Sequence, residues 1–244
     1  MQQKPEMIFF DYGHTLCYEP VQDYPAGWAA VMEHAVENRS GITAAELSWF
    51  CMSTYRRVWD ATRPLELETD GFKLDAELYE CLGLEFDLPL EELEYIRWRA
   101  TEPIMPMEGI EGFLALCAER GIRTAVISNL SYSGAALRRR IDETLPFHRF
   151  EFILASSEGV FRKPSERIFR RAMARARVTP EKCWFIGDDV RCDIEGAARA
   201  GIYPVWYKSP LKCTYKPESK TPPQCEFTRV ESWDELGDIL RGLI

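Results

Sequence analysis

Residues 7–11, with the sequence Met-Ile-Phe-Phe-Asp, form a short apolar run that ends at a carboxylate. A second apolar run, 124–127, ends at Ser128-Asn129, and a third, 183–186, is followed by Gly187-Asp188. Short apolar runs of this kind are typical of parallel strands that are buried on both faces of a sheet. We therefore predict three buried strands, each of which delivers polar groups at its carboxyl end.

Helical patterns alternate with these strands along the chain. Strands alternating with helices of about 8 to 15 residues indicate an α/β fold with a doubly wound, Rossmann-like parallel sheet. Gly121 and Gly201 are plausible helix ends. The further strands are expected at 152–154 and 202–206, and the helices at 110–119, 165–176 and 194–200.

The interval 20–104 departs from this alternation. It shows helix-like periodicity, many aromatic residues and no buried-strand pattern, so we expect a smaller, all-helical cap domain inserted into a core made of 1–19 and 105–244. It contains 17 acidic and 7 basic residues, against 22 and 23 in the remainder. A solvated acidic surface is the simpler interpretation, and a preference for cationic substrates is the alternative. We expect its aromatic residues to form a core.

Composition limits the class of protein. The 244 residues include 39 acidic and 30 basic side chains and carry a formal net charge of −9, which argues against a nucleic-acid partner. No apolar stretch is long enough to cross a membrane or to act as a signal peptide, so we expect a soluble, cytoplasmic protein without a membrane partner. The eight cysteines form no Cys-x-x-Cys pair and are expected to be reduced, structural thiols. The arginines at 138–140 are expected on a solvated helix face.

The carboxylates that follow the strands predict a metal site. In an open α/β sheet, ligands bind beyond the carboxyl ends of the strands where the strand order reverses. If the strands 7–10 and 183–186 are neighbours there, Asp11, Asp188, Asp189 and Asp193 converge. Carboxylates crowded together repel one another unless a cation holds them, and oxygen ligands without nearby His or Cys select a hard ion. We therefore expect Mg²⁺ as the cofactor.

Positive and hydrogen-bonding groups complete a phosphoryl-transfer site. Ser128 and Asn129 offer a hydroxyl and backbone N–H groups, and Lys163 offers an ammonium that suits a phosphate oxygen. Asp11 is then placed to attack phosphorus as a nucleophile, which would give an aspartyl-phosphate that water hydrolyses.

Four motifs in this order resemble the haloacid dehalogenase superfamily, whose members are mostly phosphatases. The resemblance implies Asp11 as nucleophile and metal ligand, Ser128 and Lys163 as phosphoryl-binding groups, and Asp188, Asp193 and Asp189 around the metal. It also implies that Thr15 hydrogen-bonds around the nucleophile loop and that the segment 20–104 is a cap that sets substrate choice. The motifs are residues 9–16, 127–129, 162–164 and 187–197.

Gly13 departs from the family pattern. Phosphatases of the superfamily usually carry there an aspartate that serves as general acid and base, whereas the glycine keeps only a backbone carbonyl for the metal. General acid–base help is typically worth roughly 10²- to 10⁴-fold, so proton transfer is expected to be impaired. His14 could replace the missing acid, or it could pack and hydrogen-bond within the loop.

These observations predict a magnesium-dependent phosphatase that acts on a small phosphorylated metabolite. The alternative is a phosphate- or metabolite-binding protein with weak or no turnover because of Gly13. A dehalogenase is disfavoured because the carboxylates at 188, 189 and 193 repel anions without a metal, and a phosphomutase because it depends on the absent acid. The sequence identifies neither the substrate nor the oligomeric state.

Overall fold

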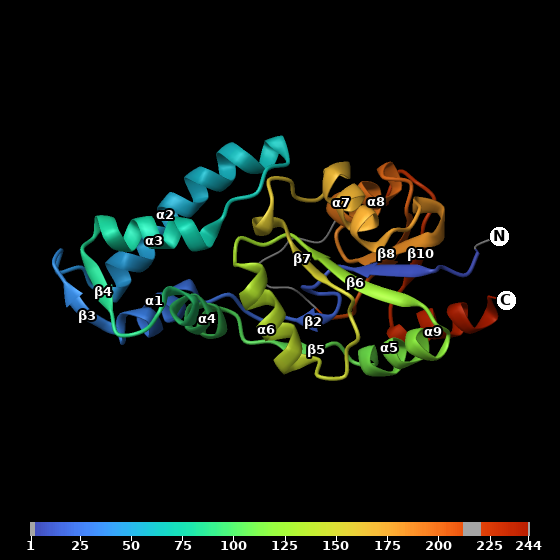
Figure 1. Ribbon diagram of the computed structural model, residues 1–244, viewed down its shortest axis with the longest axis horizontal. Helices are drawn as coiled ribbons and strands as arrows, with labels where there is room; N and C mark the ends of the chain where they lie inside the picture. The colour runs from blue at the N-terminus through green and yellow to red at the C-terminus, as the bar shows by residue number, and fades with distance from the viewer. Residues whose placement is uncertain (1–2, 212–220, 244) are drawn as a thin grey trace.

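A six-stranded parallel sheet organises the computed structural model, which describes residues 3–211 and 221–243. The strands are in the order β10-β9-β8-β1-β6-β7 (Figure 1). The α/β class and the parallel sheet predicted from the apolar runs are therefore confirmed. The strands are β1 (Met7–Phe10), β6 (Arg123–Ser128), β7 (Ile153–Ala155), β8 (Cys183–Gly187), β9 (Tyr203–Tyr207) and β10 (Thr228–Val230).

The strand order reverses at β1, which lies between β6 and β8. Phe10 is in register with Val126 of β6 on one side and with Ile186 of β8 on the other. The predicted strands 7–10 and 183–186 are thus neighbours, which is the arrangement that brings the predicted metal ligands together. The carboxyl ends of β1, β6 and β8 meet at one edge of the sheet, where an open α/β fold binds its ligands.

Helices cover both faces of this sheet, and β1 alternates between them. Ile8 and Phe10 face a core formed with α5, α6 and α9, whereas Met7 and Phe9 face a core formed with α7 and α8. Figure 1 shows the two groups of helices on opposite sides of the strands. Burying each large apolar side chain contributes roughly 1.5–3 kcal/mol. The helices are α5 (Ile110–Glu119), α6 (Gly134–Thr144), α7 (Glu166–Ala176), α8 (Gly196–Arg199) and α9 (Trp233–Gly242).

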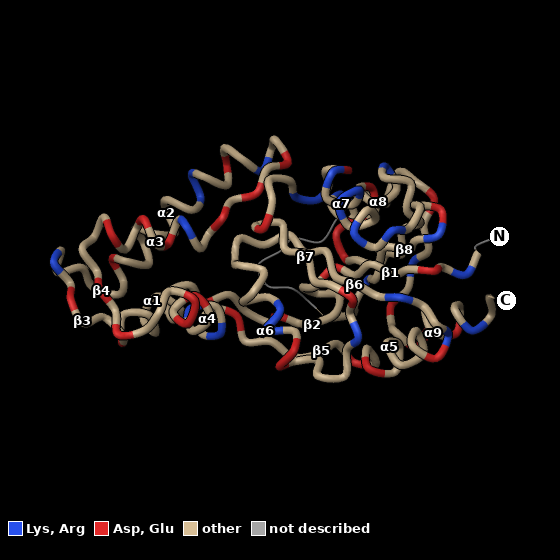
Figure 2. The backbone as a smooth tube through the Cα atoms, in the orientation of Figure 1, with Lys and Arg blue, Asp and Glu red and all other residues tan. Residues whose placement is uncertain are grey.

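The segment 20–104 packs around a core of its own. Trp28 is fully buried there, and Leu47, Tyr79 and Leu93 pack in the same cluster. Not every aromatic residue is in this core, because Trp49 is 73% exposed. Figure 2 shows acidic residues spaced along the segment. The helices are α1 (Tyr24–Met32), α2 (Ala44–Thr62), α3 (Gly71–Cys81) and α4 (Leu90–Thr101), with a 3₁₀ turn at Arg63–Leu65.

The segment is not all-helical, which corrects the expectation from the sequence. The strands β3 (Ala35–Asn38) and β4 (Leu84–Phe86) form a small antiparallel pair. Three of the four residues of β3 are exposed, so the pair lacks the buried apolar run that predicts a core strand. A second short pair, β2 (Cys17–Tyr18) with β5 (Met105–Pro106), joins the points where the chain leaves and re-enters the core.

Two further findings bear on the sequence predictions. The seven cysteines within the described ranges are free thiols, and Cys213 lies outside those ranges. Among the described residues, no helix combines the length and the apolar composition needed to cross a bilayer.

Candidate active site

Three carboxylates meet at the carboxyl edge of the sheet. Asp11 follows β1, Asp188 follows β8, and Asp193 lies in the π-helical turn Val190–Glu195 that comes next. Each offers an oxygen atom, and these oxygens lie within 4.8 Å of one another. The structure therefore brings together three of the four carboxylates that the sequence analysis assigned to a metal.

Asp189, the fourth, shapes the turn instead of joining that group of oxygens. Its side chain accepts a hydrogen bond from the backbone N–H of Cys192 (2.8 Å), and its own N–H donates to Oδ2 of Asp193 (2.9 Å). Gly187 makes room for this arrangement, because a Cβ atom there would lie 2.4 Å from Oδ2 of Asp193. The glycine at the end of β8 thus allows the Asp193 carboxylate to approach the backbone closely.

Lys163 links two of the carboxylates. Its Nζ atom is 2.6 Å from Oδ1 of Asp11 and 2.7 Å from Oδ1 of Asp193, and its side chain is 2% exposed. Burial opposes the charged form, but the carboxylates of Asp11 and Asp193 outweigh it and raise the pKa of Lys163. Within this group three carboxylates face one ammonium, so a divalent cation would balance the two remaining negative charges.

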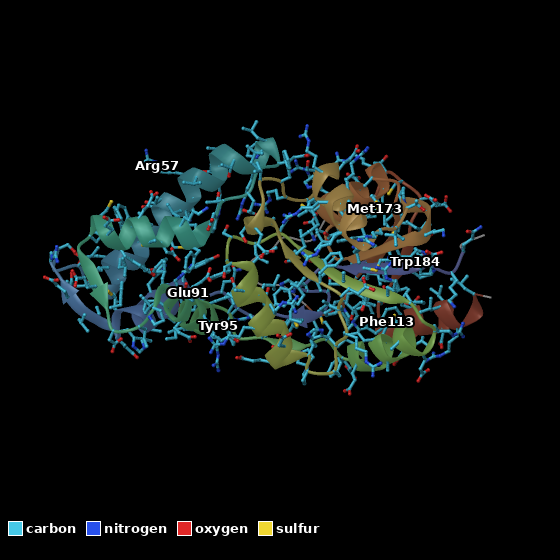
Figure 3. All side chains as sticks on the ribbon, viewed as in Figure 1. Arg57, Glu91, Tyr95, Phe113, Met173 and Trp184 are labelled. Carbon is cyan, nitrogen blue, oxygen red and sulfur yellow. The ribbon has the colours of Figure 1, made fainter. Side chains whose placement is uncertain are left out.

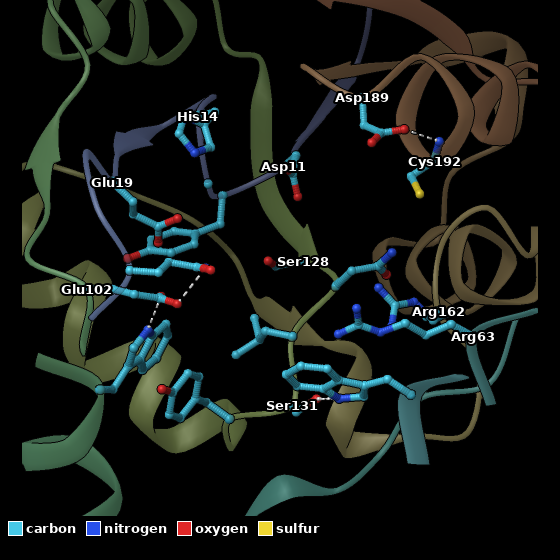
Figure 4. Close-up of a pocket in the computed structure, with 18 of the residues that line it drawn as sticks. Asp11, His14, Glu19, Arg63, Glu102, Ser128, Ser131, Arg162, Asp189 and Cys192 are labelled. Carbon is cyan, nitrogen blue, oxygen red and sulfur yellow. Dashed lines mark hydrogen bonds between the residues drawn. The ribbon is translucent and has the colours of Figure 1, made fainter. Parts of the chain in front are cut away.

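Asn129 positions the backbone of Lys163. The Lys163 N–H donates to Oδ1 of Asn129, and Nδ2 of Asn129 donates to the Lys163 carbonyl, both at 2.7 Å. The amide of Asn129 is therefore engaged with Lys163, while its predicted contact with substrate stays a prediction. Ser128 ends β6, is buried, and borders the same pocket as Asp11 (Figure 4).

The loop after Asp11 places a different carboxylate beside the glycine. A Cβ atom on Gly13 would lie 3.0 Å from Oε2 of Glu19, so this buried glutamate fills the space that a side chain at position 13 would use. His14 adopts a left-handed backbone conformation (φ 56°) and its ring packs edge-on against Tyr18 at 5.8 Å. Figure 4 shows His14 and Glu19 on the same side of the pocket.

Thr15 does not behave as expected. Its side chain is fully buried, does not border the pocket, and its hydroxyl has no hydrogen-bond partner within the part of the chain that the structure describes. The hydrogen bond predicted around the nucleophile loop is therefore absent there. The residue contributes packing beneath the loop instead.

A pocket of about 660 Å³ lies between this edge of the sheet and the segment 20–104. This volume lies within the range of small-molecule sites. Sequence reasoning missed several of the residues that border it, namely Glu19, Glu102, Arg56, Trp59, Arg63 and Arg162. Of these residues, only Arg162 could have been found from the sequence, because it precedes Lys163 within a motif. The other residues belong to no motif.

Comparisons with known proteins agree with this fold. The sequence matches the haloacid dehalogenase-like hydrolase family over residues 6–201, and the chain belongs to that family. It is 31% identical to a phosphoserine phosphatase of Thermus thermophilus over 48% of this chain and 46% of that protein. It is 32% identical to a glyceraldehyde 3-phosphate phosphatase of Methanothermobacter thermautotrophicus over 62% of this chain and 74% of that protein. The chain thus spans less than half the length of the first of these relatives.

A solved structure shows the same fold over the whole chain. The HAD phosphatase from Thermococcus onnurineus aligns over 100% of this chain and 99% of its own, with a TM-score of 0.62 and 18% sequence identity. At this identity the likeness concerns the fold alone.

Proposed function

We propose that this chain is a magnesium-dependent phosphatase that acts on a small phosphorylated metabolite through an aspartyl-phosphate on Asp11. The observation that carries the proposal is the position of Asp11 at the carboxyl end of β1, within a group of three carboxylates and one buried lysine. Membership of a hydrolase family and similarity to two proteins named as phosphatases support it. In this proposal the segment 20–104 is the cap that encloses the substrate.

The donor set fits magnesium. Asp11, Asp188 and Asp193 offer oxygen atoms only, which is the ligation that hard divalent cations prefer. These residues would hold the ion, and the backbone carbonyl of Gly13 and the carboxylate of Asp189 are further predicted ligands. When bound, the ion would supply a positive charge that offsets the negative charge of the phosphoryl group.

The chain's own residues then account for the two half-reactions. A carboxylate oxygen of Asp11 forms a bond to phosphorus while the bond from phosphorus to the leaving oxygen breaks, and the leaving oxygen takes up a proton from solvent water. Lys163 and Ser128 bind the phosphoryl oxygens. A water oxygen then bonds to this phosphorus and gives up a proton to solvent, while the bond from phosphorus to the Asp11 oxygen breaks. This step releases phosphate and restores the Asp11 carboxylate.

A second candidate is a phosphometabolite-binding protein with little turnover. The observation that favours it is Gly13, which has no side chain to donate a proton to the leaving group. Loss of general acid–base help would cost roughly 10²- to 10⁴-fold in rate. The binding groups would remain.

A phosphate-release screen separates these candidates. Wild-type protein, incubated with Mg²⁺ and a panel of phosphorylated metabolites, should release phosphate from at least one member, and EDTA should stop it. Asp11→Asn should reduce release to background, whereas Asp238→Asn, an exposed aspartate on α9, should not. Activity retained by Asp11→Asn would exclude the aspartyl-phosphate route, and magnesium-dependent binding without release would favour the second candidate.

A further inference from the structure

We propose that the pocket contains a second anion subsite, formed by Arg63 and Arg162, so that the preferred substrates are phosphomonoesters that carry a carboxylate or a second phosphate. This inference rests on the proposed function for the first phosphate, which the carboxylate and lysine group would process. It goes further by naming the chemical class of the remainder of the substrate.

The two arginines come from different parts of the chain and meet at one wall of the pocket. Arg63 begins the 3₁₀ turn after α2 in the segment 20–104, and Arg162 immediately precedes Lys163 in the core. Both border the pocket that contains Asp11 and Ser128. Figure 4 shows their side chains together, on the wall opposite Glu19. A ligand in the pocket would therefore contact both parts of the chain at once.

The guanidinium of Arg63 forms no direct ion pair in the part of the chain that the structure describes. It lies over the ring of Trp59 at 4.1 Å, and it has no hydrogen-bond partner among residues 3–211 and 221–243. Partial burial is the larger cause, and the positive charge of Arg162 the second, of a lowered pKa of Arg63. Arg162 has Glu68 as its partner, with Nη1 at 3.4 Å from Oε1. Two guanidinium groups held near each other, of which only Arg162 is in direct contact with the Glu68 carboxylate, favour a bound anion.

A third arginine borders the same pocket. Arg56 lies seven residues before Arg63, which is two helical turns along α2, and it also borders the pocket. Its side chain is exposed and forms no ion pair or hydrogen bond with any residue that the structure describes. The segment 20–104 has an excess of acidic residues, yet Arg56 and Arg63 both border the pocket.

The opposite wall would direct the second anion toward the arginines. Glu19 and Glu102 border that wall, and both are buried. Glu102 accepts hydrogen bonds from Trp98 and from Gln22, each at 2.8 Å. Because acidic groups repel anions at close range, a substrate with two anionic ends is expected to place one at Lys163 and the other at the arginine wall.

Three stable phosphonates test the subsite without hydrolysis. Propylphosphonate has one anionic end, 3-phosphonopropionate adds a carboxylate, and 1,3-propylenediphosphonate adds a second phosphonate on a similar spacer. Calorimetric titration of the wild-type protein with Mg²⁺ present should show that both probes with two anionic ends bind roughly 10- to 100-fold more tightly than propylphosphonate, the effect of a charge-assisted contact. Which of the two binds more tightly identifies carboxylate or phosphate as the second group.

Arg63→Gln should remove most of this preference and leave propylphosphonate affinity unchanged within about twofold. Arg57→Gln is the matched control, because Arg57 is exposed, does not border the pocket, and points away from the rest of the molecule in Figure 3. It should retain the preference.

Equal binding of the three probes, no binding of any of them, or equal weakening of all three in Arg63→Gln would each overturn the subsite. Failure of the subsite can be distinguished from failure of the proposed phosphatase activity. A protein that distinguishes the phosphonates but releases no phosphate has the subsite without the activity, and one that releases phosphate without distinguishing them has the activity without the subsite.

Discussion

Position 13 carries no side chain, and the Glu19 carboxylate occupies the neighbouring space. An aspartate introduced there would place its carboxylate against that of Glu19, because even a Cβ atom would lie 3.0 Å from Oε2. Gly13→Asp alone should therefore improve alkyl phosphate hydrolysis by less than about tenfold, below the range of general acid catalysis. Gly13→Asp combined with Glu19→Gln should improve it further. Values of kcat/KM for an alkyl and an aryl phosphate measure both effects.

The aryl substrate is the control for this pair of variants. Its acidic leaving group departs without a proton, so it should gain less than the alkyl substrate. Equal gains on both substrates would mean that another group, such as His14, already supplies the proton.

Asp188 allows a test of the metal site that does not depend on activity. A cation that binds only the folded state stabilises it by about 2.7 kcal/mol at 100 times its Kd, which raises the unfolding midpoint of a chain of this size by roughly 5–10 °C. Mg²⁺ should produce such a rise in the wild type, EDTA should reverse it, and Asp188→Asn should largely lose it. Asp238→Asn should respond like the wild type. A rise that survives in Asp188→Asn would place the ion elsewhere.

At the residue scale, the sequence predicted the positions of the side chains that lie at the ends of strands. Asp11, Asp188 and Ser128 directly follow or end apolar runs, so the parallel sheet alone determines that they lie at one edge. Glu19 could not be predicted in this way, because its position depends on how the loop after β1 folds back on Gly13. Arg63 reaches the pocket through the packing of a separate helical segment, which no local pattern encodes.

At the element scale, an ion pair holds the amino-terminal end of β6. Arg123 contacts both carboxylate oxygens of Glu151 (2.5 and 2.6 Å) and also donates to the carbonyl of Ala176 (2.8 Å). The hydrogen bond from Arg123, together with its charge, lowers the pKa of Glu151. The stabilisation from a lowered carboxylate pKa is present above the unfolded value of about 4.3 and is lost as the pH falls through the folded value.

Glu151→Gln should therefore destabilise the protein near neutral pH and less so in acid. Both side chains are more than a third exposed, so solvent screening limits the effect to about 0.5 kcal/mol. Thermal unfolding should show that the difference in stability between the wild type and the variant becomes smaller as the pH falls from 7 to 3.5. Glu119→Gln, at an exposed position of α5, should show no such trend. A difference that stays constant with pH would assign the effect to something other than this pair.

The elements that the sequence predicted are those with a strong local pattern. The strands 7–10, 124–127 and 183–186 were expected within one residue of their observed ends, because continuous apolar runs identify buried strands. The strand β10 and the helix α9 were not predicted, and α6 was expected only as a helix face around residues 138–140. The arginines of α6 suggested a solvated face, yet Arg140 is buried and donates to the hydroxyl of Tyr12 (3.0 Å). Tertiary contacts, which local patterns do not carry, determine that burial.

At the scale of the whole molecule, buried hydrogen bonds and an ion pair connect the segment 20–104 to the core. Glu68 is the clearest example, since its side chain is 1% exposed. Its carboxylate accepts a hydrogen bond from the Ser156 hydroxyl (2.6 Å) and contacts Arg162 (3.4 Å). The backbone N–H of the same residue donates to the Val160 carbonyl (2.9 Å). One residue therefore connects the helical segment to the core loop that leads to Lys163.

Removing the carboxylate should weaken this connection and disturb the pocket at the same time. Glu68→Ala leaves the Ser156 hydroxyl and the Arg162 guanidinium without this buried partner, which should cost roughly 1–3 kcal/mol of unfolding free energy. Glu77→Ala, at an exposed position of α3, should stay within about 0.5 kcal/mol of the wild type. Urea denaturation measures both. If Glu68→Ala matches Glu77→Ala, the attachment of the segment does not depend on this carboxylate, and the geometry of the arginine wall must be held by other contacts.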